Sequence, residues 1–142
     1  MKYYIFLFAI LLFVSCEQPL DFSNSQFYDV EEILTSRNCD GDCEEMADCE
    51  GQTVKMIGTI DEGKINSATF NFFMTDRSNG QVDMEVRVDT SMSAEIFSFL
   101  AGRGGFDARI ISELQGEDGS GSNCAREIYM VVDEVADIEI IE

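Results

Sequence analysis

Four cysteines are the residues whose chemistry depends most directly on spacing. They are Cys39, Cys43, Cys49 and Cys124, in a chain of 142 residues. An even number of cysteines in a small domain outside the cytoplasm typically forms disulfides, and four allow three pairings. Zinc binding and free thiols are the competing interpretations, but the spacing lacks the paired C-x₂-C of zinc ribbons. We therefore expect two disulfides, and every pairing joins Cys124 to the segment 39–49.

Oxygen-bearing side chains in the same segment are spaced like the ligands of a calcium loop. Positions one, three, five and seven of such a loop would be Asn38, Asp40, Asp42 and Glu44. Position six of the loop normally requires Gly, and position twelve normally supplies a bidentate Glu. Both positions are cysteines here, Cys43 and Cys49. We expect no more than a weak calcium contact, and the simpler interpretation is a solvated acidic loop fixed by disulfides.

Catalytic chemistry is restricted by the absence of histidine from the whole sequence. This excludes Ser/His and Cys/His nucleophilic systems and every His-ligated zinc or haem site. The chain has 28 Asp and Glu residues, so chance carboxylate pairs are unavoidable and none singles out a glycosidase. The glycine-rich stretch 102–105 lacks the Lys-Ser/Thr of a phosphate-binding loop. We expect a protein that is not an enzyme and that binds no cofactor other than the possible calcium.

The N-terminus has the layout of a secretory signal: Lys2, then an apolar run over 5–14, then Ser15 and Cys16. The apolar run is shorter than the roughly 20 residues that span a bilayer. Phe13-Val14-Ser15-Cys16 resembles the lipobox of bacterial lipoproteins. The resemblance implies a signal peptide over 1–15, acyl chains such as palmitate on Cys16, and a lipid anchor in the bacterial cell envelope, which we expect to lie in the outer membrane. Attachment through several acyl chains is stable rather than reversible.

Charge restricts the class of ligand. The 28 acidic residues face only 9 basic ones, a formal net charge of −19 that becomes −20 once Lys2 leaves with the signal. Affinity for nucleic acid comes mainly from cations that meet phosphates, so a nucleic-acid partner is not expected. The simplest interpretation of the excess is an acidic, solvated surface that keeps the domain soluble.

The chain after the signal divides into three parts. Residues 16–27 contain the only proline and are interpreted as the lipidated cysteine and a tether. Residues 28–50 begin with a short amphipathic helix over 28–36 and continue as the acidic cysteine-rich segment. The third part, 51–142, carries the main domain.

Hydrophobic alternation with a period of two predicts strands in the third part, each with one face buried and one in water. The expected strands are 53–60, 68–76, 81–89, 106–114 and a final strand or bent pair over 127–141. Helical spacing predicts a helix over 91–100 with Ser91 as its N-cap. A flexible loop is expected over 116–122.

The order strand, strand, strand, helix, strand, strand resembles the oligonucleotide/oligosaccharide-binding (OB) fold over 51–142. Gly58 in the middle of the first strand, residues 72–76 and the valine-rich third strand are the details that carry the resemblance. A glycine inside a strand often marks a sharp bend or the close approach of another backbone. The resemblance implies a mainly β chain, a five-stranded Greek-key barrel with a helix between strands three and four. The short helix near the N-terminus would precede this barrel.

In that fold the usual ligand surface is the exposed side of strands two and three. Alternation places on it Thr69, Asn71, Phe73, Thr75, Asp83, Glu85 and Arg87. One aromatic ring, one cation and two carboxylates do not suit phosphate, but they suit a neutral glycan, a cationic peptide or a protein partner. Phe73 is the residue that a merely solvated face would not need. The alternative is that Phe73 packs beneath the N-terminal segment or the loop 115–123.

These observations predict a lipid-anchored cell-envelope protein that acts as a non-catalytic binding or interaction module. Its partners would be the membrane, through the lipid anchor, and a protein, a glycan or another neutral or cationic ligand. Two alternatives stay open: a small structural accessory subunit of an outer-membrane complex, and a weakly calcium-dependent module.

Overall fold

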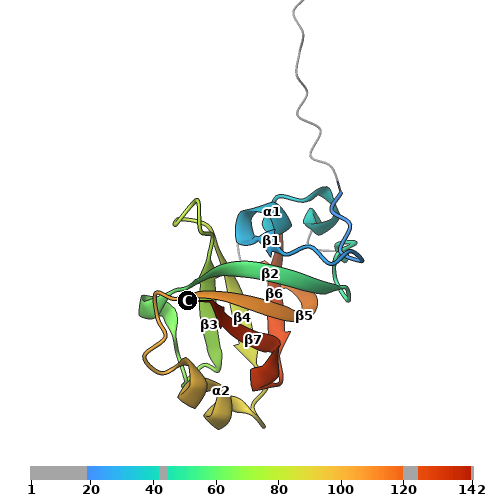
Figure 1. The fold of residues 1–142 in the computed structure, drawn as a ribbon. Helices are drawn as coiled ribbons and strands as arrows, with labels where there is room; N and C mark the ends of the chain where they lie inside the picture. Colours follow the sequence, from blue (N-terminus) through green and yellow to red (C-terminus); the bar gives the residue numbers. More distant parts are fainter. Residues whose placement is uncertain (1–18, 42–44, 120–124, 142) are drawn as a thin grey trace, which may run out of the picture.

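A computed structural model describes residues 19–41, 45–119 and 125–141. The described strands form one sheet in the order β1-β2-β3-β4-β6-β5-β7 (Figure 1). The strands are β1 (Tyr28–Asp29), β2 (Thr53–Ile60), β3 (Asn71–Thr75), β4 (Asp83–Val88), β5 (Asp107–Asp118), β6 (Arg126–Val132) and β7 (Ile138–Ile141). The helices are α1 (Val30–Leu34) and α2 (Ser93–Leu100), with 3₁₀ turns η1 (Arg37–Cys39), η2 (Glu62–Lys64) and η3 (Val135–Asp137).

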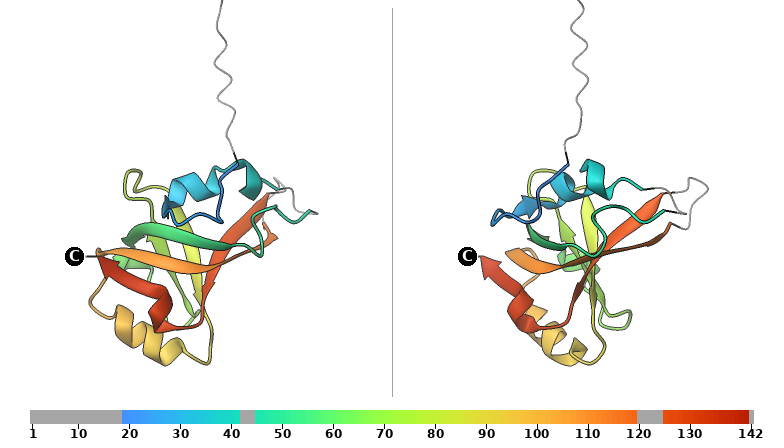
Figure 2. Two further views of the ribbon diagram at one scale, coloured as in Figure 1. Left: turned by 45° about the vertical axis from the view of Figure 1, so that its right-hand side comes forward. Right: turned by 90° about the vertical axis from the view of Figure 1, so that its right-hand side faces the viewer.

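A second pairing of β2, with β5, closes five of these strands into a barrel. Going around the barrel, the order is β2, β3, β4, β6, β5, and only the contact between β4 and β6 is parallel within it. Helix α2 joins β4 to β5, the third and fourth barrel strands in chain order, and lies at one end of the barrel (Figure 2). The mainly β, OB-like barrel predicted from the element order is confirmed.

The barrel forms because alternate residues of its strands are apolar and point inward. Phe72 of β3 lies opposite Val86 of β4, and Met74 lies opposite Met84; all four side chains are at most 1 % exposed. Burying each such side chain contributes about 1.5–3 kcal/mol. Helix α2 adds Ile96 and Leu100, spaced by one helical turn and both fully buried, and this closes the end of the core.

At Gly58 the N-terminal helix and a neighbouring backbone approach β2 closely, as the glycine inside a strand predicts. A Cβ atom at this position would lie 2.9 Å from the Thr75 carbonyl oxygen and 3.0 Å from a Val30 methyl carbon. The missing side chain therefore lets α1 and β3 pack directly against the backbone of β2.

Asp76 joins the turn between β3 and β4 to the start of α1. Its carboxylate is 2 % exposed and accepts hydrogen bonds from the Glu31 N–H at 2.9 Å and from the N–H groups of Ser78 and Asn79, both at 2.9 Å, as well as from the Ser78 hydroxyl at 2.8 Å. Burial alone would raise the pKa of Asp76, but these hydrogen bonds outweigh it and lower the pKa. A charged Asp76 therefore stabilises the folded state.

The segment that precedes α1 is packed on the barrel from Leu20 onward, so the expected tether over 16–27 is too long. Phe22 and Tyr28 are 7 % and 4 % exposed, and their rings meet edge to face with centroids 5.6 Å apart. The Asn38 side chain accepts a hydrogen bond from the Leu20 N–H and donates one to the Leu20 carbonyl, both at 3.1 Å. Apolar burial and these two bonds fix the part of the expected tether that follows Pro19.

The cysteine-rich segment is held by a disulfide and by an ion pair. Cys39 and Cys49 are bonded, and the Gly41 carbonyl accepts the backbone N–H of Arg126 at 3.1 Å. The guanidinium of Arg126 donates to both oxygens of Glu50, at 2.8 and 2.7 Å. This bidentate pair lowers the pKa of Glu50 despite the opposing effect of burial. The segment before β2 is thereby attached to the start of β6.

Four local expectations differ from the structure. Helix α1 is shorter than 28–36 because residues 28–29 pair with β2 as β1. Ser91 is not the N-cap of α2: its hydroxyl donates to the Asp89 carboxylate at 2.5 Å, and Met92 occupies the cap position without a side-chain bond. Strand β5 continues to Asp118, into the expected loop 116–122, because it pairs there with β6. Phe106, the first residue of the expected strand 106–114, lies just before β5 and is 45 % exposed, although its alignment with Ala108 and Ile110 in that strand predicts an inward side chain.

The final segment is a bent pair, as one of the two sequence interpretations has it, with β6 and β7 separated by η3. Both strands pair with β5, one after the other along its length. Among the described residues, no helix is both long enough and apolar enough to cross a bilayer.

Candidate functional site

Strands β3 and β4 present one row of half-buried side chains on the outer face of the barrel. Cα register places Asn71 opposite Arg87, Phe73 opposite Glu85, and Thr75 opposite Asp83. These six residues define the β3–β4 face. Their strand neighbours Phe72, Met74, Met84 and Val86 point into the core, so alternation alone fixes which side each residue occupies.

Thr69 is the one residue of the predicted set that does not lie on the strand. Asn66 and Asn71 exchange backbone hydrogen bonds at 2.9 and 3.2 Å and so close a tight turn before β3 begins. Phe70 completes this turn with a φ of 56°, a conformation that is uncommon for any residue except glycine. Thr69 stays next to the face, since its hydroxyl lies 2.7 Å from the Asn71 side-chain oxygen.

At one end of the β3–β4 face, an ammonium group lies against two carboxylates and an aromatic ring. The Lys64 Nζ atom of η2 lies 5.3 Å from the centroid of the Phe73 ring, within the range of a cation–π contact. The same atom pairs with Asp83 and lies 3.5 Å from Asp61. The hydrogen bond with Asp83 raises the pKa of Lys64. Lys64 therefore contacts the Phe73 ring, a contact that no pattern in the sequence predicts.

The other end of the face repeats this arrangement with Arg87 and Tyr129. The Arg87 guanidinium carbon lies 3.7 Å from the centroid of the Tyr129 ring. Its nitrogens donate to both oxygens of Glu117 and to Glu85, the latter at 3.0 Å. These bonds raise the pKa of Arg87, and the bond that Arg87 donates to Glu117 has the largest effect. Arg87 also lowers the pKa of Glu117 through the same hydrogen bond.

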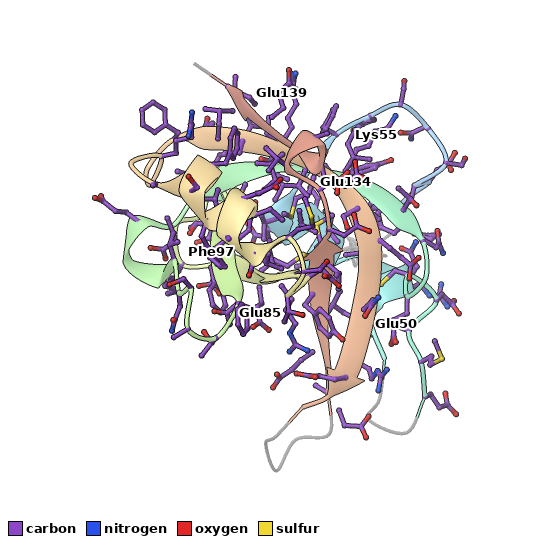
Figure 3. All side chains as sticks on the ribbon, turned by 90° about the horizontal axis from the view of Figure 1, so that it is seen from below. Glu50, Lys55, Glu85, Phe97, Glu134 and Glu139 are labelled. Atoms are coloured by element: carbon purple, nitrogen blue, oxygen red, sulfur yellow. A yellow bond between two sulfur atoms is a disulfide. The ribbon has the colours of Figure 1, made fainter. Side chains whose placement is uncertain are left out.

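Glu85 lies between the two clusters. One of its oxygens accepts from Arg87, and the other accepts from the Asn71 amide at 2.5 Å. The β3–β4 face therefore carries two polar clusters, one beside the Phe73 ring and one beside the Tyr129 ring. Figure 3, which looks up at the barrel from the α2 end, shows Glu85 on the opposite side of the molecule from Lys55 of β2.

Four residues of this surface were not part of the predicted set: Asp61, Lys64, Glu117 and Tyr129. Tyr129 could have been found from the alternation of β6, because Met130 and Val132 are buried and Tyr129 therefore points outward. Lys64 and Glu117 come from a 3₁₀ turn and from a strand end that the sequence assigned to a loop. Their positions follow from the closure of the barrel, which no local pattern encodes.

A hollow with a volume of about 370 Å³ lies elsewhere, between α2 and η2. Its lining is Glu62, Ile65, Ser67, Phe97, Leu100, Ala101, Gly102 and Gly104. One carboxylate and one hydroxyl among small and apolar groups do not form a convergent set of polar groups for binding or catalysis. The β3–β4 face is the better candidate.

Several predicted residues can be followed only in part. Cys16, Asp42, Cys43, Glu44 and Cys124 lie outside the described residues. Of the remaining calcium candidates, Asp40 is exposed, and Asn38 uses its side-chain oxygen to accept the Leu20 N–H. Within the described residues, no three or more Cys, Asp or Glu side chains come together in a geometry that could hold a metal ion. The calcium expectation stays a prediction.

Compared with known proteins, the chain matches no protein-family model and no curated protein sequence. The fold and the geometry of the β3–β4 face are therefore the basis for the function proposed below.

Proposed function

We propose that this protein is a lipid-anchored module of the bacterial cell envelope that binds a protein or another neutral or cationic ligand on its β3–β4 face, without catalysis. The observation that supports it most is the placement of Phe73 and Tyr129 on the outer wall of an OB-like barrel, with charged groups between them. Aromatic residues with a polar surround are typical of the energetic centre of binding surfaces.

The charge of this surface favours a cationic or neutral ligand over an anionic one. Its carboxylates outnumber its cations, and both cations are already paired: Lys64 with Asp83 and Asp61, Arg87 with Glu85 and Glu117. A phosphate group would meet excess negative charge, whereas an ammonium, a guanidinium or a neutral hydroxyl-rich ligand would not.

Lys64 supports the cationic alternative more specifically. Its ammonium group is exposed, yet it lies against an aromatic ring and between two carboxylates. A lysine or arginine of a partner would find the same three contacts if it displaced this side chain. We therefore favour a partner protein that presents basic side chains.

The proposal is tested by co-purification from detergent-solubilised envelopes followed by quantitative mass spectrometry. The variants are Phe73→Ala and Tyr129→Ala, and the matched control is Ile111→Ala, an exposed apolar residue on β5, 43 % accessible. A partner bound at this face should be depleted about tenfold or more by either variant, as for an aromatic hot spot, and retained by the control.

Circular dichroism of each variant first establishes that it is folded. Equal recovery of the same partner by all four proteins would rule out the β3–β4 face. A stable high-mass complex in size-exclusion chromatography that persists in Phe73→Ala and Tyr129→Ala would instead favour a structural accessory subunit.

A further inference from the structure

The N-terminal segment is fixed to one end of the barrel by contacts that begin at Leu20. Its backbone forms two hydrogen bonds with the Asn38 side chain, and Phe22 is buried two residues later. The start of the described chain and α1 lie at this end, while α2 lies at the opposite end (Figures 1 and 2). We call residues 20–40 the N-terminal pole.

Covalent geometry then limits how far the domain can stand from its lipid anchor. Three residues lie between Cys16 and Leu20, so four steps along the chain join them, and a fully extended chain spans at most about 3.5 Å per step, or about 14 Å in all. A domain of this length has a radius of gyration of roughly 13 Å and is about 34 Å across. The tether is thus less than half as long as the domain is wide.

From this comparison, and on the proposed lipid anchor at Cys16, we infer that the N-terminal pole is the surface turned toward the bilayer. The partner of this pole is the layer of lipid headgroups. The α2 end cannot reach the membrane, because that would require Leu20 to rise about 34 Å above it on a tether of about 14 Å. The domain therefore has a membrane-facing end and an outward-facing end.

The charges of the pole indicate how it meets the lipid. Its exposed charged side chains are mostly acidic: Asp21, Glu32 and Asp40 against Arg37. An acidic surface is repelled by anionic headgroups and does not insert into them. The pole is thus held next to the bilayer by the short tether and not by adhesion.

This orientation of the domain also determines how the β3–β4 face lies relative to the bilayer. The turn between its strands is joined to α1 by the bonds of Asp76 and by the ion pair of Arg77 with Asp29, at 2.8 Å. That end of the face is the one near the membrane, and the end with Asn71 and Arg87 points outward. A partner of the face would meet it from the side, in the space beside the anchor and above the bilayer.

The experiment uses the full-length lipidated protein reconstituted into zwitterionic vesicles that contain an acceptor dye on the headgroups. A donor dye is attached through a non-natural amino acid either at Arg37, on the pole, or at Ser98, on the exposed side of α2. Energy transfer should be about twofold or more greater from position 37 than from position 98. A flexible insertion of twenty residues between Gln18 and Pro19 should remove most of this difference.

Vesicle flotation distinguishes a failure of the proposed lipid anchor from a failure of the proposed orientation. A native protein that does not float with vesicles, or that floats no better than Cys16→Ala, would overturn the proposed anchor. Equal energy transfer from both positions in a protein that does float would overturn the orientation alone. Greater transfer from position 98 would overturn it as well.

Discussion

Among the residues that the structure describes, Asp76 is the one whose side chain accepts the most hydrogen bonds at a junction between elements. We expect Asp76→Ala to lower the free energy of unfolding by about 1–3 kcal/mol, because it leaves part-buried N–H groups of α1 and the turn without their acceptor. Asp89 is the matched control: it accepts the Ser91 N–H and hydroxyl in a similar turn but is exposed. Asp89→Ala should change stability by less than about 0.5 kcal/mol. Urea unfolding of both variants measures the difference.

The same carboxylate predicts a dependence on pH. Its pKa is lower in the folded protein than the ordinary value of 3.8, so the folded state favours the charged form. The stabilisation is fully present above that ordinary value and is lost as the pH falls through the folded-state pKa. The stability difference between the native protein and Asp76→Asn should therefore shrink below pH 3.8. A difference that is constant from pH 7 to about pH 2 would contradict this.

Lys64 provides the test of the cationic ligand. If it occupies the position of a partner's basic side chain, Lys64→Met should increase affinity for a lysine-rich peptide by about two- to fivefold, the range of an exposed cation–π contact. Lys55→Met removes the same charge from another side of the barrel (Figure 3) and should bring a smaller increase. Isothermal titration calorimetry with one peptide compares the three proteins. An equal gain in affinity in both variants would mean that the net charge of the protein, and not the position of Lys64, determines peptide binding.

At the scale of elements, the packing of α1 on β2 depends on Gly58. We expect Gly58→Ala to cost about 1–3 kcal/mol, because the new methyl group would overlap the Thr75 carbonyl and a Val30 methyl group. Gly80 is the control, since a Cβ there meets nothing within 4 Å. Thermal unfolding followed by circular dichroism should give a lower midpoint for Gly58→Ala only. Equal midpoints would mean that α1 does not pack as closely as described.

The second disulfide is the other prediction at this scale. The bond between Cys39 and Cys49 leaves Cys43 and Cys124 as the remaining pair of the two expected disulfides. Residues close to both in sequence, Gly41 and Arg126, are joined by a backbone hydrogen bond. Non-reducing peptide mapping should therefore recover a peptide that links Cys43 to Cys124. Alkylation of both as free thiols in the native protein would refute the pairing.

For the molecule as a whole, the sequence was most informative where burial alternates along the chain. The bounds of β2 follow from the pattern of residues 53–60, and the face assignments of β3 and β4 follow from period two, because each side chain has only two directions. The predicted helix cap and strand end differ from the structure where a tertiary contact competes with a local preference. Ser91 bonds to Asp89 instead of capping α2, and β5 extends because β6 offers it a partner.

The sequence by itself determined the kind of fold, the side of each strand that faces water, and the strong negative charge that disfavours nucleic acid. These depend on residue type and local period. Only the tertiary structure decided that Cys39 pairs with Cys49, that Lys64 and Arg87 lie over Phe73 and Tyr129, and that the chain is fixed from Leu20 onward. Each of these contacts joins residues that no local pattern relates: packing within the N-terminal segment makes the first and the last, and the strand arrangement of the barrel makes the two between the cations and the rings.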